Sequence, residues 1–214
     1  MAELKIAEIY RSVQGESSFA GWPCTFVRTA GCDIRCRYCD EPAALRSGDR
    51  MPLEQVLERV TALGRGLVEV TGGEPLLQAA VPELVSALIK DDYEVLIETG
   101  GHRDISVLDP RCHVILDIKT PGSGMSAHND LANLERLGPG DEVKVVLCDR
   151  ADYDWAKALV AEYALTDQVP VSFSPVHGEL DPRELTDWLL HDRIDVRLNL
   201  QLHKYIWGPD ATSV

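Results

Sequence analysis

Short runs rich in apolar and β-branched residues alternate along the chain with segments in which apolar residues recur every three or four positions. The strand-like runs cover residues 6–10, 25–29, 67–71, 93–98, 113–119, 142–147, 169–173 and 195–201. Between the second and third runs, one helix face is marked at the i, i+3, i+4 and i+7 positions by Leu53, Val56, Leu57 and Val60. Strands that alternate with helices in this way predict a mostly parallel sheet covered by helices.

The same helical spacing recurs in two later segments, at Val81, Leu84, Val85 and Leu88 and again at Leu185, Trp188 and Leu189. Asp181 and Pro182 precede the last of these, as an N-cap and a first helical residue. A complete eightfold β/α barrel typically needs about 250 residues, whereas this chain has 214. We therefore expect one α/β domain over residues 1–214, an incomplete, open barrel of six or seven mostly parallel strands. A doubly wound flat sheet is the alternative.

Composition narrows the class of protein. The formal net charge of −14 argues against nucleic acid as the main partner, because phosphate neutralisation needs a basic face. No apolar run approaches the roughly 18 residues of a membrane span, so no membrane insertion is expected. Residues 1–10 lack a basic stretch followed by an apolar core, so no secretory signal is expected either. We expect a cytoplasmic protein whose thiols stay reduced.

Conspicuous polar or glycine-rich turns follow nearly every predicted strand. They comprise residues 31–32, 71–75, 98–101, 117–122, 174–178 and 201–205. In parallel α/β folds, functional sites assemble at the carboxyl ends of the strands. All of these turns are therefore expected to face one common cavity.

The first of these turns opens a cysteine motif, Cys32-x3-Cys36-x2-Cys39. Three thiolates in one loop cannot complete a four-ligand structural zinc site. They can hold three irons of a [4Fe–4S] cluster and leave the fourth iron open to a small molecule. That open position separates a reactive cluster from a passive electron carrier, and the motif therefore predicts an iron–sulfur enzyme.

With Tyr38 directly before the third cysteine, the motif resembles the signature of the radical S-adenosylmethionine (SAM) superfamily. Residues 71–75 (Thr-Gly-Gly-Glu-Pro) resemble the element of that superfamily that contacts the SAM amine. The resemblance implies that Cys32, Cys36 and Cys39 bind the cluster and that SAM chelates the open iron. It also implies SAM contacts at Tyr38, Gly73, Asp117, Ile118, Lys119, Ser174, Pro175, Val176 and His177.

Within that superfamily, the chain resembles the 7-carboxy-7-deazaguanine synthase family over nearly its whole length. The resemblance lies in residues 12–16 (Ser-Val-Gln-Gly-Glu), Arg28, residues 70–78 and residues 201–205 (Gln-Leu-His-Lys-Tyr). The family converts 6-carboxy-5,6,7,8-tetrahydropterin to 7-carboxy-7-deazaguanine with loss of ammonia, a radical lyase reaction on the route to queuosine and other 7-deazapurines. The implied substrate contacts are Val13, Gln14, Gly15, Glu16, Arg28, Thr71, Glu98, His203 and Pro209.

The chemistry of these residue types agrees with that implication. Arg28 suits a substrate carboxylate because its planar guanidinium can bind one through two parallel hydrogen bonds. Gln14, Glu16 and Glu98 are expected to recognise the donor-rich edge of the pterin. The hydrogen abstraction needs a primary carbon radical, which no side chain supplies, so a cofactor must provide it.

The chain departs from the family at three places. The family usually has Asp-Thr or Asp-Ser after the third cysteine, where the hydroxyl helps to coordinate Mg²⁺, but this chain has Asp40-Glu41. A carboxylate is also a hard oxygen ligand, so we expect a magnesium ion to be retained at Glu41. Family members often end near Pro209, and here residues 210–214 follow. Gly100 stands where the family commonly has Asn.

The resemblance further implies an electron donor such as flavodoxin and a homodimer, and symmetric dimers are the commonest oligomers. Two other interpretations stay open. A radical SAM activase, which generates a glycyl radical on a partner protein, could have the same size and a single cluster. A non-catalytic electron carrier or a zinc-binding module would need four ligands and no SAM site.

Overall fold

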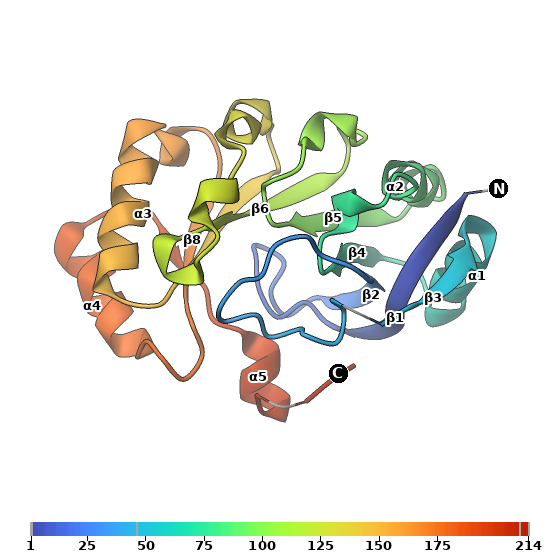
Figure 1. Ribbon diagram of the computed structural model, residues 1–214, viewed down its shortest axis with the longest axis horizontal. Helices are drawn as coiled ribbons and strands as arrows, with labels where there is room; N and C mark the ends of the chain where they lie inside the picture. The colour runs from blue at the N-terminus through green and yellow to red at the C-terminus, as the bar shows by residue number, and fades with distance from the viewer. Residues whose placement is uncertain (1, 46, 210, 214) are drawn as a thin grey trace.

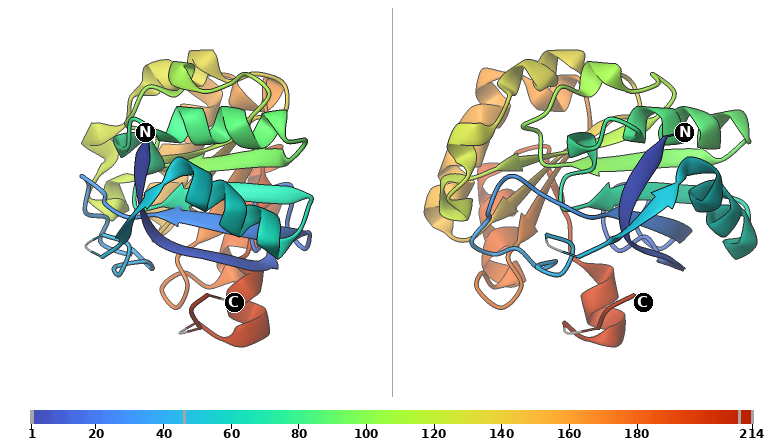
Figure 2. Two further views of the ribbon diagram at one scale, coloured as in Figure 1. Left: turned by 90° about the vertical axis from the view of Figure 1, so that its right-hand side faces the viewer. Right: turned by 45° about the vertical axis from the view of Figure 1, so that its right-hand side comes forward.

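The computed structural model describes residues 2–45, 47–209 and 211–213. Within these ranges nine strands form one sheet in the order β3-β1-β2-β4-β5-β6-β7-β8-β9 (Figures 1 and 2). They are β1 (Glu3–Val13), β2 (Pro23–Thr29), β3 (Asp49–Pro52), β4 (Leu67–Gly72), β5 (Glu94–Thr99), β6 (His113–Lys119), β7 (Glu142–Leu147), β8 (Val171–Pro175) and β9 (Arg197–Leu198). β1 is antiparallel to both of its neighbours, and all other pairs are parallel.

The sheet is open and strongly curved. Its parallel part contains seven of the described strands, β2 and β4 to β9, and its two edges, β3 and β9, do not pair with each other. Lys144 on β7 contacts Glu98 on β5 although β6 lies between them. The strands wrap around one interior with the helices outside (Figures 1 and 2), and this contact joins two side chains that face that interior. The open barrel is confirmed, and the flat sheet is wrong.

Four helices, α1 (Leu53–Leu63), α2 (Val81–Lys90), α3 (Arg150–Glu162) and α4 (Pro182–Asp192), lie outside the sheet, and the short α5 (Leu202–Trp207) lies apart from them (Figure 1). The main core fills the space between sheet and helices. Its fully buried members include Val70, Ile97, Leu116, Val145, Leu84, Leu88, Tyr153 and Leu185. No helix in the described ranges combines the length and hydropathy needed to cross a bilayer.

Three of the helices begin where the apolar spacing predicts them, at α1, α2 and α4. At α4, the Asp181 carboxylate accepts a hydrogen bond from the Arg183 amide at 2.9 Å, and Pro182 is the first helical residue, so the predicted N-cap is confirmed. The sequence pattern did not predict α3. Its buried face includes the small Ala156 and the polar Asp152, which dilute the apolar spacing.

Two strands differ most from the prediction because neither is a buried apolar run, whereas β1 extends the predicted 6–10 to Glu3–Val13 and β8 begins two residues later than the predicted 169–173. β3 was not predicted; it buries only Met51 and forms by pairing with β1, where Leu4 lies opposite Met51. β9 covers two residues instead of the predicted 195–201, and both are exposed. Residues 199–201 lead instead into α5.

A second apolar cluster, here called the plug, fills the inside of the curved sheet near the amino ends of the parallel strands. It consists of Cys24, Phe26, Leu67, Leu96 and Ile115, with Tyr10 and Phe19 packed against it. Phe19 belongs to the loop of residues 14–22 that joins β1 to β2. That loop is tied to the start of β7, because the Ser18 hydroxyl donates to the Glu142 carboxylate at 2.8 Å. Apart from Glu69, which lies at the depth of the plug, the charged side chains described below lie above it, toward the carboxyl ends of the strands.

Candidate active site

The three motif cysteines lie in the loop after β2, residues 30–45, called the cluster loop below. All three are free thiols; Cys32 and Cys36 are half-buried and Cys39 is exposed. Burial raises the pKa of Cys32 and of Cys36 above the usual thiol value. The Cys39 amide donates to the Cys36 carbonyl at 3.2 Å, which makes a tight turn between the last two thiols.

The glycine turn after β4 lies directly against the cluster loop. The Glu74 amide donates to the Gly31 carbonyl at 2.9 Å. A Cβ atom added to Gly73 would lie 2.8 Å from the Cβ of Cys32, closer than two side chains can approach. Glycine at position 73 is therefore required for this contact between turn and loop.

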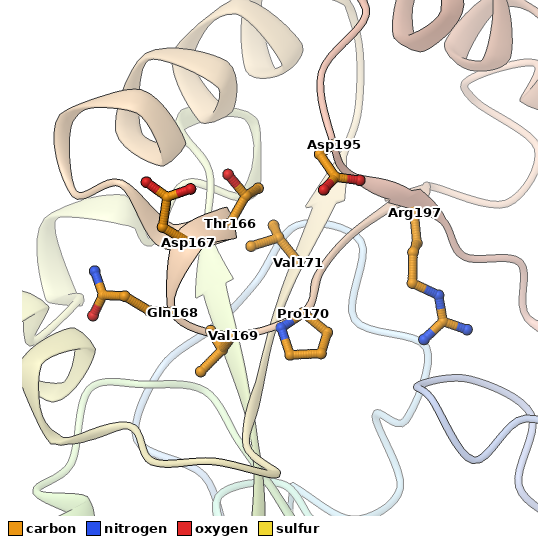
Figure 3. Close-up of a pocket in the computed structure, with 8 residues that line it drawn as sticks. All are labelled: Thr166, Asp167, Gln168, Val169, Pro170, Val171, Asp195 and Arg197. Atoms are coloured by element: carbon orange, nitrogen blue, oxygen red, sulfur yellow. The ribbon is translucent and has the colours of Figure 1, made fainter.

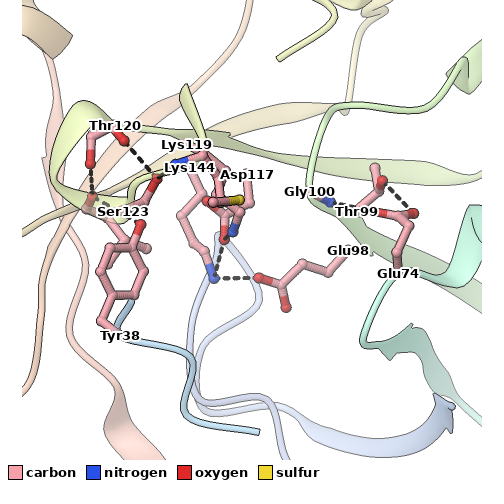
Figure 4. Close-up of polar contacts among 12 residues, drawn as sticks. Tyr38, Glu74, Glu98, Thr99, Gly100, Asp117, Lys119, Thr120, Ser123 and Lys144 are labelled. Atoms are coloured by element: carbon pink, nitrogen blue, oxygen red, sulfur yellow. Dashed lines mark hydrogen bonds and ion pairs between the residues drawn. The ribbon is translucent and has the colours of Figure 1, made fainter. Parts of the chain in front are cut away.

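Glu74 is fully buried and joins the ends of two neighbouring strands (Figure 4). Its carboxylate accepts hydrogen bonds from the Thr99 hydroxyl at 2.8 Å and from the Gly100 amide at 2.9 Å, both at the end of β5. It also accepts one from the Leu76 amide at 2.9 Å. A buried carboxylate with three donors holds the turn rigidly. Gly100 takes part through its backbone, so this contact needs no side chain there.

A polar centre occupies the interior above the plug, built around Lys144 on β7 (Figure 4). The Lys144 ammonium lies 2.7 Å from Glu16 Oε2 and 3.7 Å from Asp117 Oδ2, and it also pairs with Glu98. Burial opposes the charge, but Glu16 and Glu98 outweigh it and hold the pKa of Lys144 well above its usual value. Lys144 likewise overcomes burial to lower the pKa of Glu16, whereas burial keeps the pKa of Glu98 raised. Glu16 and Glu98 are thus both counter-ions of Lys144.

Gln14 and Glu69 form a second buried polar pair in the interior. The Gln14 side chain donates to the Glu69 carboxyl group, and its own oxygen accepts from the Glu16 amide at 2.9 Å. Glu69 is buried on β4, and burial together with the charge of Glu98 raises its pKa well above the usual value. Because both ends of the Gln14 amide are engaged inside the protein, only one of its N–H groups is left for a ligand.

Residues 117–119, implied to contact SAM, end strand β6. Lys119 Nζ lies 2.9 Å from Asp117 Oδ2, while Asp117 Oδ1 is buried and has no hydrogen-bond partner among the described residues. The Ile118 side chain is fully buried in the main core, so only its backbone can face a ligand in the interior. Asp117 therefore presents an unused acceptor at this end of the barrel.

Residues 174–177, the second implied SAM segment, end β8 and begin the following loop. The Ser174 hydroxyl accepts from the Asn199 side chain at 2.9 Å. The next two residues are buried and His177 is exposed. Glu179 Oε2 lies 2.7 Å from Arg37 Nη2, so the loop after β8 is held against the cluster loop.

Arg28 on β2 lies among acidic and phenolic groups. Its Nε is 2.8 Å from Glu8 and 3.5 Å from Glu41, and its Nη2 donates to the Tyr10 hydroxyl at 3.2 Å. Burial opposes the charge, but Tyr10 and Glu41 outweigh it and raise the pKa of Arg28. Arg28 is paired with Thr71 in the ladder between β2 and β4, so two implied substrate contacts are adjacent. The expected magnesium ligand Glu41 faces this guanidinium.

Helix α5 links the β9 edge of the sheet to the loop of residues 14–22 and to the cluster loop. The His203 ring lies so close to Gly15 that a Cβ there would collide with it. Gln201 Nε2 donates to Glu16 at 2.9 Å and to Asp40, directly after the third cysteine, at 3.0 Å. Burial lowers the pKa of His203, which favours the neutral imidazole. The helix thus brings His203 beside Glu16.

The residues present fit a cluster and SAM better than they fit magnesium. Three free thiols on one loop are soft donors suited to an iron–sulfur cluster, and the unpartnered Asp117 Oδ1 suits a donor group of SAM. For magnesium the fit is poor, because Glu41 is engaged with Arg28. Within the described ranges, no three or more His, Cys, Asp or Glu side chains converge on a position for a single metal ion, whereas the thiols of a cluster each bind a different iron.

Sequence reasoning missed Lys144 and Glu69, which lie at the centre of the interior. Each is a charge flanked by apolar residues within a strand, Lys144 between Val143 and Val145 of β7 and Glu69 between Val68 and Val70 of β4. Strands of a parallel sheet are buried on both faces, so such a charge there indicates a buried polar position, and that signal could have revealed both. Conversely, the implied substrate contact Pro209 is exposed after the end of α5.

A hollow of about 390 Å³ lies elsewhere, at the amino ends of β8 and β9 (Figure 3). It is lined by Thr166, Asp167, Gln168, Val169, Pro170, Val171, Asp195 and Arg197. None of these residues belongs to the implied cluster, SAM or substrate contacts. The hollow is therefore separate from the candidate active site.

Comparison with known families agrees with this geometry. Residues 26–118 match the family model of the radical SAM superfamily. Together with the open parallel barrel and the three-cysteine loop, that match defines a radical SAM domain, a class whose cofactors are a [4Fe–4S] cluster and SAM. More narrowly, the chain belongs to the 7-carboxy-7-deazaguanine synthase family, as its relatives show.

The chain is 49% identical to 7-carboxy-7-deazaguanine synthase of Chlorobaculum tepidum, over 100% of this chain and 98% of that protein. It is 41% identical to 7-carboxy-7-deazaguanine synthase of Koribacter versatilis, over 99% of this chain and 100% of that protein. The crystal structure of QueE from Escherichia coli is similar with a TM-score of 0.78 at 22% identity, covering 94% of this chain and 95% of that one. At that identity the structural likeness shows the fold alone.

Proposed function

We propose that the chain is a radical SAM lyase that converts 6-carboxy-5,6,7,8-tetrahydropterin to 7-carboxy-7-deazaguanine with loss of ammonia, in the biosynthesis of queuosine or other 7-deazapurines. Relatives at 49% and 41% identity carry the name of this activity. The structural observation that supports it most is the polar centre. Glu16 and Glu98 meet inside the barrel, at the same end as the cluster loop.

In this proposal, residues of the barrel interior bind both ends of the substrate. Glu16 and Glu98 supply acceptors for the N–H groups along one edge of the pterin, and Arg28 supplies the cation for its carboxylate. Thr71 lies beside Arg28 in the sheet, and the substrate carboxylate would compete with Glu41 for the guanidinium. A ring fixed at two ends presents one carbon to the radical. This orientation of the substrate is the protein's main contribution to the rate.

Cys32, Cys36 and Cys39 would hold the cluster, while Tyr38, Gly73 and the segments 117–119 and 174–177 would hold SAM. When bound, these groups supply the carbon radical that takes a hydrogen atom from the substrate. The chain's own task is to keep the site ordered and dry. Glu74 locks the glycine turn, and α5 with the loop of residues 14–22 covers the interior.

A small molecule suits this site better than the glycine of a partner protein. Lys144 is 6% and Asp117 is 7% exposed, and the side chains of Glu16 and Glu98 are 15% and 25% exposed, so the polar centre is largely buried. An activase would have to bring a folded partner's backbone to that depth. The buried position of these charges therefore supports the lyase over the glycyl-radical activase.

A magnesium ion at Glu41 stays a prediction, and the contact between Glu41 and Arg28 does not favour it. An electron donor such as flavodoxin, a homodimer, a cytoplasmic location and a single domain over residues 1–214 also stay predictions. Magnesium can be tested by comparing the substrate KM with and without the ion; an unchanged KM would reject a role for it in substrate binding.

The function is tested anaerobically with the reconstituted protein, SAM, a reductant and 6-carboxytetrahydropterin, and the product is identified by mass. We expect 7-carboxy-7-deazaguanine, and replacement of Cys32, Cys36 or Cys39 by Ala should abolish SAM cleavage because the cluster loses a ligand. Cys112→Ala, at a buried cysteine of the main core, is the matched control and should keep activity. Deoxyadenosine without any 7-deazapurine would reject the substrate while leaving the radical chemistry in place.

A further inference from the structure

Lys144 gathers carboxyl groups from three separate parts of the chain. Glu16 comes from the loop after β1, Glu98 from β5 and Asp117 from β6, and the ammonium is in ion-pair range of all three. Glu16 is 128 positions and Glu98 46 positions away in sequence. No local structure can hold these two carboxyl groups together. Lys144 contacts both of them.

The charges around this lysine do not balance. Asp117 also pairs with Lys119 at 2.9 Å, but among the described residues no cation is in ion-pair contact with Glu69. Buried carboxylates in a low-dielectric interior repel one another and bind protons unless a cation separates them. Without Lys144, Glu16 and Glu98 would either separate or take up protons, and both changes would spoil their use as acceptors.

We propose that Lys144 is a specificity-determining positioning residue: it sets the spacing of Glu16 and Glu98 so that the pair accepts hydrogen bonds from adjacent N–H groups of one flat heterocycle. The inference rests on the proposed function for the identity of that heterocycle. Lys144 acts through the two carboxylates rather than by touching the substrate. Its contact with Asp117 also connects the substrate acceptors to the segment implied to hold SAM.

Two kinetic consequences distinguish this role from a merely structural one. A misplaced acceptor pair weakens substrate binding, so KM should rise much more than kcat falls. A poorly oriented ring also fails to meet the radical, so SAM should be cleaved without turnover, and the ratio of deoxyadenosine to 7-deazapurine product should rise.

The test compares the reconstituted wild type with Lys144→Met and Lys144→Arg. We expect Lys144→Met to raise KM on the order of 100-fold, the effect of unpairing a buried charge, and to increase the deoxyadenosine-to-product ratio. Lys144→Arg keeps a cation that can bridge two carboxylates and should recover most of the loss. Lys157→Met is the control, because Lys157 of α3 pairs at 2.6 Å with a single carboxylate, that of Asp192 at the end of α4, away from the polar centre.

A double-mutant cycle covers the case in which Lys144→Met folds poorly. Lys144→Met/Glu98→Gln removes the cation together with one carboxylate, and we expect the Glu98→Gln effect on KM to be much smaller in that background than in the wild type. An unchanged KM and product ratio in Lys144→Met, or additive effects in the cycle, would overturn the proposal. A wild type that yields no 7-deazapurine would instead reject the proposed function.

Discussion

The plug and the polar centre lie on the same strands, two residues apart, and have opposite chemistry. On β5, Leu96 belongs to the plug and Glu98 to the polar centre; on β6, Ile115 and Asp117 are related in the same way. Alternate residues of a strand point to the same face, so both members of each pair face the barrel interior. They differ only in depth, the apolar member lying toward the amino end and the polar member toward the carboxyl end.

Within the barrel interior, the plug contributes to folding and the polar centre to the proposed function. Burying the plug side chains stabilises the fold by roughly 25 cal/mol for each Å² of apolar surface removed from water. Burying Lys144 with several carboxyl groups does not, since desolvation offsets much of the attraction between them. A sequence selected only for stability would place apolar residues at both depths. Under the proposed function the polar centre binds the substrate, so its substitution should affect activity more than stability.

The largest expected effect comes from Glu98→Gln, which leaves the shape of the polar centre but removes one acceptor. We expect kcat/KM for 6-carboxytetrahydropterin to fall on the order of 100-fold or more, because a buried donor of the substrate then lacks its partner. Stability should not fall, since burial already disfavours the charge on Glu98. Steady-state kinetics and urea unfolding measure the two effects.

Glu94→Gln, at the exposed start of the same strand, is the control for Glu98→Gln and should leave both quantities unchanged. If Glu98→Gln lost stability but kept kcat/KM, the polar centre would belong to folding, and the contrast with the plug would disappear.

The second-largest effect comes from Leu96→Ala, which should lower stability and leave substrate binding unchanged, the opposite of Glu98→Gln. Removing this fully buried side chain from the plug should cost about 2–5 kcal/mol of unfolding free energy, the range for Leu→Ala in a core. The KM of the molecules that stay folded should not change, because Leu96 lies below the polar centre. The urea midpoint and the KM together report this, with the exposed Leu190→Ala on α4 as a control that should change neither.

The smallest effect concerns Glu69, a polar residue at the depth of the plug, opposite Phe26 and Leu96 in its two ladders. Its pKa is raised in the folded state, above the value of about 4.3 in an unfolded chain. Between those two values the folded protein binds a proton that the unfolded chain has lost, so Glu69 makes stability decrease as pH rises. Glu69→Gln removes this dependence.

We therefore expect the difference in Tm between Glu69→Gln and the wild type to shift in favour of the variant by about 2–4 °C as pH increases from about 5 to 8. This is the shift that roughly 1 kcal/mol produces in a chain of this size. Thermal unfolding at several pH values measures it. The exposed Glu83→Gln should give a curve parallel to the wild type. Parallel curves for Glu69→Gln as well would show that Glu69 ionises normally in the folded protein.

Much of the fold and part of the site could be predicted from short segments. β6 and β7 match their predicted bounds, and the Asp181 cap confirms the start of α4. These features depend on residues close together in sequence, where spacing and capping chemistry act directly. β3 was not predicted and β9 is shorter than its predicted 195–201, because neither is a buried apolar run and each is defined by its pairing with another strand.

The sequence by itself determined the superfamily of this protein. Its signature, three cysteines within eight residues and a glycine turn after a strand, consists of residues close together in the chain. Only the tertiary structure decided which charges meet. It placed Lys144 against Glu16, and it turned Glu41, expected to hold magnesium, toward Arg28. The reason is physical: the partner of a buried charge is set by the curvature and register of the whole sheet, and no spacing along the chain contains that information.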